Sequence, residues 1–265
     1  MKRYLALLFF LFIPIFSNAA WTDNLILHIP FTSPSNPLQV LVGAGSMTYT
    51  ASSSGTYIHP TTGLVTISTT NHVLQSEDFT NSSWVTSSAS VVGDQTTAPD
   101  GTNTADQFIV GAAGDGSTTH SITMTVGNTS IGATSETYTA SIYVKPSSNT
   151  WINLEFFGKN GTSHNCYFNT STGAIGTCAS IESASTTVET NGFYRFSVTA
   201  SLGATTGVVP KLRLYLASAD GTRTFTGNGT DAIYLWGGQI NSGGVSPYVR
   251  TTSTSVSTPR IESSG

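Results

Sequence analysis

"KLRLYLAS", Lys211 to Ser218, alternates polar and apolar side chains along most of its length. Because successive side chains of a β-strand point to opposite faces, this alternation predicts a strand with one buried face. The buried face would carry Leu212, Leu214 and Leu216. The opposite face would carry Lys211, Arg213 and Tyr215.

Similar stretches recur along the chain, separated by clusters of Gly, Asn, Asp and Ser. They read "ADQFIV", "HSITMTV", "TYTASIYVKP", "WINLEFFG", "NCYFN", "FYRFSVTAS" and "AIYLWGGQI". None shows helical periodicity, and the chain has 26 glycines and only 9% charged residues. Short strands at fairly even spacing predict an all-β fold, a jelly-roll β-sandwich with a short N-terminal β segment.

The alternation also predicts which aromatic and charged side chains lie opposite the core. This outward set is Tyr143, Trp151, Glu155, Arg195, Arg213 and Tyr215. Outward aromatic rings beside charged side chains say more about function than an apolar core does. A sandwich has two outer faces, and the alternation does not say which strands share one. Scattered surface aromatics are the alternative interpretation.

The first residues, "MKRYLALLFFLFIPIFSNAA", combine a basic start, a short apolar run and small residues at Ser17–Ala19. This pattern is typical of a secretory signal peptide, residues 1–19, and an uncleaved anchor is the alternative. Cleavage would remove Lys2 and Arg3 and take the formal charge from −4 to −6. We therefore expect a secreted, periplasmic or cell-surface protein. A mildly acidic chain without a basic patch is a poor binder of nucleic acid.

The two cysteines, Cys166 and Cys178, lie in the part expected to be exported, where oxidation is favoured. A turn over Thr170–Ala174, with Gly173 at a positive φ, predicts a hairpin. An antiparallel hairpin centred on Thr172 sets Phe168 opposite Gly176 and Cys166 opposite Cys178. Opposed cysteines are close enough to form a disulfide. Two buried thiols are the alternative.

Several stretches together resemble the jelly-roll module of phage tail-fibre and head-spike-fibre proteins, which is similar to secreted carbohydrate-binding modules. These stretches are "VLQSEDFTNSSW", "APDGTNTADQF", "YTASIYVKP", "NGFYRFSVTA" and "AIYLWGGQINSGGVSPYVRTT". The resemblance covers residues 71–252. It leaves residues 20–70 as an N-terminal β leader segment and residues 253–265 as a low-complexity tail.

The resemblance implies a structural role for the opening stretch Asn71–Trp84. Phe79 would belong to the core. Trp84 would cap one end of the core, with its indole N–H bonded to the backbone. The stretch around Trp236 would form the last strand and pair near the first.

The resemblance also implies Asp78 and Asp231 as candidate oxygen ligands of a structural calcium ion. Ordinary turn acids are the favoured alternative. We do not expect an enzyme, because adjacent Glu77 and Asp78 would point to opposite faces and no catalytic motif occurs.

The sequence therefore predicts a non-catalytic module, a phage-fibre-like adhesin that binds glycan or a cell-surface polysaccharide. The outward set would supply ring stacking and hydrogen bonds to sugar hydroxyls. Two alternatives remain. One is a structural or assembly subunit, a homo-oligomer whose outward aromatics form an interface. The other is an accessory domain of a glycan-active enzyme.

Overall fold

The structure is a computed structural model and describes residues 56–58, 65–67, 69–112, 117–127, 131, 136–202 and 209–258. The chain divides into two compact units, Met1–Thr48 and Tyr49–Gly265, and all described residues belong to the second. The predicted signal peptide lies outside the described residues, as does most of the leader segment. No helix within the described part is long and apolar enough to span a membrane.

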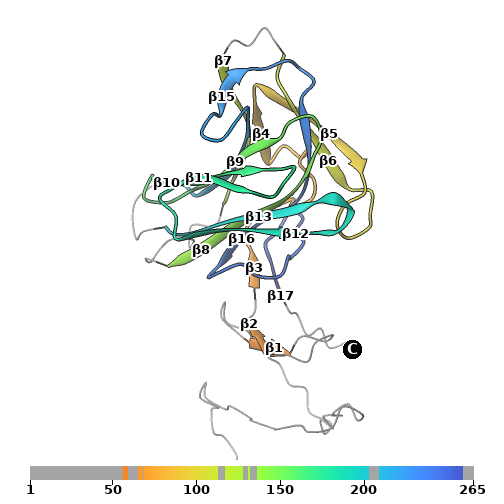
Figure 1. The fold of residues 1–265 in the computed structure, drawn as a ribbon. Helices are drawn as coiled ribbons and strands as arrows, with labels where there is room; N and C mark the ends of the chain where they lie inside the picture. Colours follow the sequence, from red (N-terminus) through yellow and green to blue (C-terminus); the bar gives the residue numbers. More distant parts are fainter. Residues whose placement is uncertain are drawn as a thin grey trace, which may run out of the picture. The chain divides into compact units, whose positions relative to one another are not determined.

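Two antiparallel sheets form a sandwich, as the sequence predicted (Figure 1). The first, here the β9 sheet, has the order β11-β10-β9-β14-β7-β15, with β4 also paired to β7. Its strands are β4 (Trp84–Ser87), β7 (Ser117–Thr125), β9 (Trp151–Phe157), β10 (Ser163–Asn169), β11 (Ile175–Ala179), β14 (Lys211–Ala217) and β15 (Thr224–Thr226).

The second sheet, here the β8 sheet, has the order β12-β13-β8-β16-β6-β5. Its strands are β5 (Ala89–Thr96), β6 (Ala105–Val110), β8 (Thr137–Pro146), β12 (Ser183–Val188), β13 (Tyr194–Ser201) and β16 (Ala232–Ser242). A 3-10 turn, η2 (Thr190–Gly192), precedes β13. Figure 1 shows β8, β13 and β16 together in one layer, with β9, β10 and β11 in the other.

The core lies between the two sheets and consists of the inward rows that alternation predicted. Leu212, Leu214 and Leu216 are at most 1% exposed. They pack with the inward residues of β9, Ile152, Leu154 and Phe156. From the β8 sheet come Ile142, Val144, Phe196 and Val198. Alternation therefore placed the core side of these four strands correctly.

The opening stretch is structural, as the resemblance implied. Phe79 is 1% exposed, and its ring lies 4.6 Å from that of Trp84. Trp84 donates its indole N–H to the backbone carbonyl of Gln75 at 3.0 Å. A buried indole with a satisfied N–H can close the end of a core without leaving an unpaired donor.

Two further strand pairs belong to the described residues. β1 (Thr56–Ile58) pairs with β2 (Val65–Ile67). β17 (Val256–Thr258) pairs antiparallel with β3 (Thr69–Asn71), so a strand lies within the predicted low-complexity tail. β16 is consequently not the last strand, although it does pack near the beginning of the module, where His72 N donates to Ile240 O at 2.9 Å.

The predicted hairpin forms, but its register differs from the prediction at one position. Phe168 faces Ile175 and not Gly176, because the loop is one residue shorter. Asn169 Oδ1 accepts from the N–H groups of Ser171 and Thr172, which closes the turn early. A bulge in β11 then restores the pairing of Cys166 with Cys178. Gly173 has the expected positive φ, 74°.

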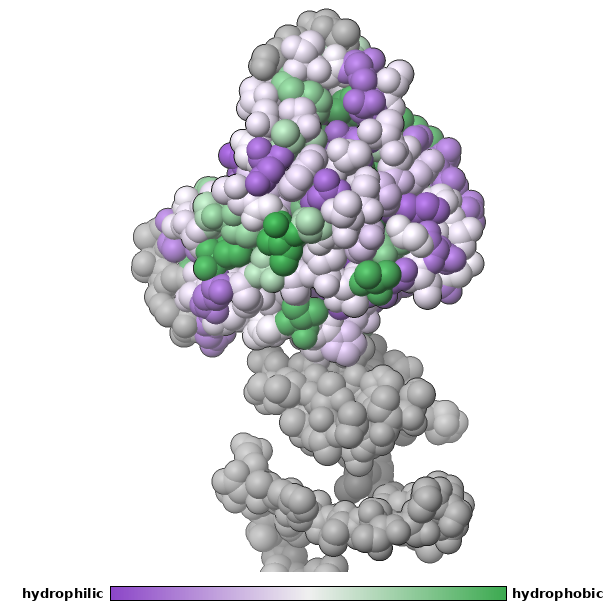
Figure 2. Space-filling view, in the orientation of Figure 1, coloured by the Kyte–Doolittle hydropathy of each residue, from purple (hydrophilic) through white to green (hydrophobic). Residues whose placement is uncertain are grey.

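Exposed hydrophobic side chains among the described residues are dispersed. Val85 in β4 is 63% exposed, Ile175 in β11 47% and Val188 in β12 76%. Figure 2 shows the same on the face in view, where hydrophobic areas are separated by neutral and polar ones. Single exposed hydrophobic residues of this kind are normal on a protein surface.

Candidate functional site

The outer face of the β9 sheet brings polar residues of β9, β10 and β14 into adjacent rows. Glu155 of β9 faces Arg213 on one side and Asn165 on the other. In the next row Asn153 lies between Tyr215 and Tyr167. These side chains share a face because each lies two residues from the next along its strand.

Glu155 is the centre of this arrangement. Its side chain is only 2% exposed, and both carboxylate oxygens accept hydrogen bonds. Oε1 accepts from Arg213 Nη1 at 2.8 Å. Oε2 accepts from Arg223 Nη1 at 3.1 Å and from Ser163 Oγ at 2.7 Å. A buried carboxylate is tolerated only when it is paired and hydrogen-bonded in this way.

Both arginines are also held against aromatic rings. The Arg213 guanidinium lies 4.7 Å from the ring centroid of Phe157, and that of Arg223 lies 4.5 Å from the ring centroid of Tyr215. The guanidinium plane suits such stacking. The two side chains remain 22% and 35% exposed, so solvent reaches them although Glu155 is covered.

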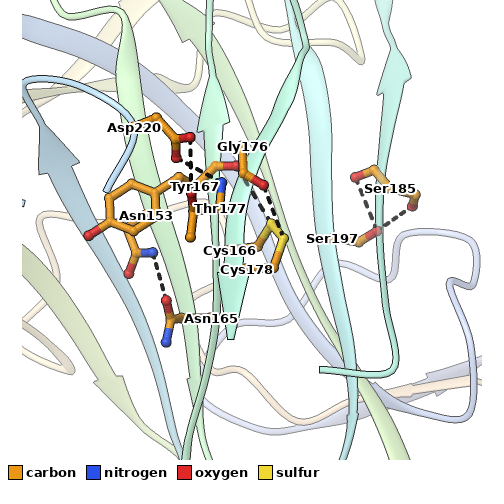
Figure 3. Close-up of a disulfide and its surroundings, with 10 residues drawn as sticks. All are labelled: Asn153, Asn165, Cys166, Tyr167, Gly176, Thr177, Cys178, Ser185, Ser197 and Asp220. Atoms are coloured by element: carbon orange, nitrogen blue, oxygen red, sulfur yellow. Dashed lines mark hydrogen bonds between the residues drawn. A yellow bond between two sulfur atoms is a disulfide. The ribbon is translucent and has the colours of Figure 1, made fainter. Parts of the chain in front are cut away.

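An amide ladder extends the arrangement across β9 and β10. Asn153 Nδ2 donates to Asn165 Oδ1 at 3.0 Å, and Asn165 Nδ2 donates to Ser163 Oγ at 3.2 Å. Arg223 Nη1 also reaches Asn153 Oδ1 at 3.3 Å. Figure 3 shows the two asparagines pointing toward each other from neighbouring strands. We call the whole set the polar face: Asn153, Glu155, Ser163, Asn165, Arg213 and Arg223.

The loop Ser218–Arg223, between β14 and β15, borders the polar face. Asp220 accepts from the backbone N–H of Thr177 at 2.8 Å and from its hydroxyl at 3.1 Å, which ties the loop to β11 (Figure 3). The loop then turns back so that Arg223 bonds Glu155 and Asn153.

Burial raises the pKa values of the Tyr167 and Tyr215 hydroxyls, so both side chains remain neutral at physiological pH.

The structure divides the predicted outward set between two faces. Trp151, Glu155, Arg213 and Tyr215 share the outer face of the β9 sheet, whereas Tyr143 and Arg195 lie on the β8 sheet. On the β9 sheet, Tyr215 is only 9% exposed and its ring carries Arg223. Tyr215 therefore supports an arginine rather than offering a bare ring, which corrects the expected stacking role.

Tyr143 and Arg195 are not surface residues, because the segment Gly243–Thr252 contacts this part of the β8 sheet. Tyr143 is 6% exposed, with the rings of Trp236 and Tyr248 at 5.1 and 5.7 Å. Arg195 is 7% exposed and donates to Ser246 O at 2.7 Å. Alternation placed both residues opposite the core correctly, but the expectation that they are exposed was wrong. Burial also raises the pKa of Tyr143.

The same segment explains why the opening stretch contains a serine and an acid. Ser76 Oγ lies 2.6 Å from the Tyr248 hydroxyl, and Thr251 N donates to Ser76 Oγ at 2.9 Å. Glu77 accepts from Arg250 Nε at 3.0 Å and from the Tyr248 hydroxyl at 3.1 Å. These residues fasten the end of the module to its beginning.

The predicted disulfide is present between Cys166 and Cys178. Their Cα atoms lie 4.0 Å apart across the β10–β11 pair. Cys166 is fully buried against the core, whereas Cys178 is exposed at the sheet edge. Figure 3 shows the bond beside β10 and β11, close to the strands that carry the polar face. The bond fixes β11, to which the Ser218–Arg223 loop is tied.

A second polar feature is an acidic cleft of about 310 Å³ at another position. Its charged lining residues are Glu77, Asp78, Asp94, Asp106 and Arg250. Burial raises the pKa of Asp106 to about 6, although its carboxylate accepts the N–H groups of Phe79 and Asp94. Burial likewise raises the pKa of Glu77, against the effect of Arg250.

The two candidate calcium ligands do not come together. Asp78 lines the acidic cleft next to Asp106, whereas the Asp231 carbonyl pairs with Val110 N. Asp106 and Val110 are four residues apart on β6, so these two neighbours of Asp78 and Asp231 lie about 13 Å apart along the strand. The described residues contain no group of three or more His, Cys, Asp or Glu side chains that could hold a metal ion. The calcium ion stays a prediction.

Sequence reasoning missed four members of the polar face. Asn153 lies two residues from Glu155 on the same face of β9, but an asparagine alone gives no functional signal. Asn165 and Ser163 alternate with Cys166 and could have been found by the same pattern. Arg223 lies in a loop, where no periodicity indicates its direction.

Comparison with known proteins gives no family for the chain. No family model matches it, and no curated protein sequence does so. Among solved structures it is similar to the enzymatically active domain of tailspike protein 4 of bacteriophage CBA120. The TM-score is 0.37 and the identity 12%, over 65% of this chain and 21% of that chain.

Two further similar structures contain carbohydrate-binding modules. One is the CBM22-1–GH10 part of a Clostridium thermocellum xylanase, complexed with xylohexaose: TM-score 0.37, identity 15%, covering 68% of this chain and 30% of that chain. The other is a carbohydrate-binding module that recognises mannan: TM-score 0.36, identity 14%, covering 66% of this chain and 96% of that chain. The chain thus spans less than a third of the first two. The β-sandwich assignment rests on the sheets themselves.

Proposed function

We propose that the protein binds glycan on the polar face and does not cleave it. The observation that carries this proposal is the fixed lattice of planar amide and guanidinium groups around Glu155. Sugar rings present adjacent hydroxyls, and planar groups with several donors and acceptors bond such pairs well. A lattice already held by internal hydrogen bonds loses little side-chain entropy when a ligand arrives.

Aromatic side chains at the border of the face support the same proposal. Trp151 and Phe157, at the two ends of β9, are both half-buried. Phe157 carries Arg213 on its ring, and the Trp151 ring lies close to Gly176 of β11. Trp151 is thus the ring best placed to contact the C–H face of a sugar.

A binding role fits Glu155 better than a catalytic one. Hydrolysis of a glycosidic bond needs a carboxyl group that can pass a proton to the leaving oxygen. Both oxygens of Glu155 are engaged by Arg213, Arg223 and Ser163, beneath side chains that cover them. Glu155 therefore orients the arginines rather than facing a substrate.

A glycan array with the full chain tests the proposal. We expect binding to at least one glycan and a loss of roughly ten-fold in affinity for Asn165→Ala, which removes amide hydrogen bonds from the face. Asn103→Ala is the matched control, because Asn103 is an exposed asparagine whose amide bonds Asp94 O in another part of the molecule. Absence of glycan binding, together with a stable multimer in solution, would favour the assembly-subunit alternative instead.

A further inference from the structure

The polar face carries two arginines for one carboxylate. Arg213 comes from β14 and Arg223 from the loop that follows it, and each bonds one oxygen of Glu155. Glu155 alone can neutralise one of them. The pair therefore leaves one positive charge in excess, although the whole chain has a formal charge of −4.

The excess charge is presented to solvent while the negative charge is hidden. The Arg213 and Arg223 side chains are 22% and 35% exposed, against 2% for Glu155. Lys211 lies two residues before Arg213 on the same face of β14 and is half-buried. Asp220, exposed at the border, accepts from neutral groups of Thr177 and keeps its negative charge, which Lys211 offsets, so one positive charge remains in excess. A ligand approaching between the arginines would therefore meet cationic groups first.

Both guanidinium groups retain hydrogen-bond donors for a ligand. Each makes the bonds described through Nη1, and a guanidinium has five N–H donors in a fixed fork. Their aromatic supports, Phe157 and Tyr215, restrict the planes in which those donors lie. A planar, pre-oriented guanidinium matches a carboxylate or sulfate group better than a neutral hydroxyl.

We infer that the glycan bound on the polar face is acidic, with a carboxylate or sulfate group placed between Arg213 and Arg223. The inference rests on the proposed function and specifies its ligand class. A neutral glycan would use the amide ladder but would leave the excess charge without a partner. An acidic sugar uses both: its hydroxyls bond Asn165, which buried Asn153 holds in place, and its anionic group bonds the arginines.

Matched pairs of polysaccharides test the requirement for charge. The full chain is titrated with polygalacturonate and its carboxyl-reduced product, with dextran sulfate and dextran, and with mannan. We expect at least one acidic polymer to bind roughly ten-fold or more tightly than its neutral match, since a charge-assisted hydrogen bond is lost in the latter. The affinity should fall when salt rises from about 0.05 M to about 0.5 M. The acidic polymer that binds identifies the group as carboxylate or sulfate.

Substitutions then test whether the arginines make the charge-dependent contact with the acidic polymer. Arg223→Gln should lose roughly ten-fold in affinity for the acidic polymer and little for any neutral one. The control Arg250→Gln removes the same charge from the acidic cleft, where Arg250 is 67% exposed, and should bind normally. Because Arg223→Gln takes a bond from buried Glu155, its melting curve is recorded. Lys211→Gln removes a charge from the same face without touching Glu155 and should weaken acidic binding by a few-fold.

The outcomes separate this inference from the proposed function. If a neutral polymer binds as tightly as its acidic match and Arg223→Gln binds like the wild type, the ligand is not acidic, although glycan binding stands. If Asn165→Ala also binds normally, the polar face is not the site. If none of these polymers binds while the array shows a neutral ligand, the inference fails and the proposed function stands; if the array shows no ligand either, both fail.

Discussion

Replacing Glu155 by Gln removes the one negative charge from the centre of the polar face and leaves the packing nearly unchanged. The loss can be worked out from its two ion pairs. The bond from Arg213, at 2.8 Å, is charge-assisted and largely desolvated, and contributes about 1.5–3 kcal/mol. The pair with Arg223 is more exposed and contributes about 0–1 kcal/mol. Gln retains one acceptor oxygen, so part of the bonding survives.

We therefore expect Glu155→Gln to lower the free energy of unfolding by about 2–3 kcal/mol, since two guanidinium groups then lose their counter-charge. For a unit of this size, that corresponds to a fall in melting temperature of about 4–12 °C. Thermal and urea denaturation of the full chain provide the measurement. Glu182→Gln is the matched control, because Glu182 is exposed and, among the described residues, its carboxylate accepts only from Thr137, at 3.2 and 3.4 Å.

Glu182→Gln should change the free energy of unfolding by less than about 0.5 kcal/mol. Equal effects of the two substitutions would refute the reasoning, because they would mean that the arginines do not depend on the buried carboxylate.

Three further predictions concern other parts of the molecule. Denatured, unreduced protein should show no reactive thiol, and reduction of Cys166–Cys178 should cost roughly 2–3 kcal/mol; two titratable thiols per chain would contradict the bond. Tyr143→Ala and Trp236→Ala should each lower the free energy of unfolding by about 3–5 kcal/mol, because both rings are buried against each other; a melting temperature like that of the wild type would show that this aromatic cluster is not packed. Because the pKa of Asp106 is raised from 3.8 to about 6 in the folded state, its protonation favours folding below pH 4, and that contribution is lost as pH rises through 6. The free energy of unfolding of the wild type should therefore fall, relative to that of Asp106→Asn, by on the order of 2–3 kcal/mol between pH 4 and pH 7; a difference independent of pH would contradict the raised pKa.

Most of the fold could be predicted from local sequence patterns. Alternation in β14 set Leu212, Leu214 and Leu216 in the core because the side-chain period of a strand is a local property. The disulfide could be predicted for a similar reason, since Cys166 and Cys178 lie in one hairpin. The register at Phe168 could not, because it depends on how the Asn169 side chain bonds the turn.

Long-range contacts account for what the sequence did not reveal about the site. Tyr143 and Tyr215 lie opposite the core, as predicted, but alternation cannot say what covers an outer face. Tyr248 packs against Tyr143 from more than a hundred residues away, and Arg223 comes from a loop to cover the Tyr215 ring. The excess of arginine over carboxylate around Glu155 became visible only when those segments were placed in space.

The central claim, that glycan binds on the polar face, is tested most directly by mapping a bound oligosaccharide through changes in the backbone amide resonances of the full chain. A short oligomer of whichever polymer binds in titration serves as the ligand. We predict that the largest changes fall on β9, β10 and β14 and on the loop Ser218–Arg223, with the acidic cleft around Asp106 unaffected. Changes confined to the acidic cleft or to the segment Gly243–Thr252 would contradict the account.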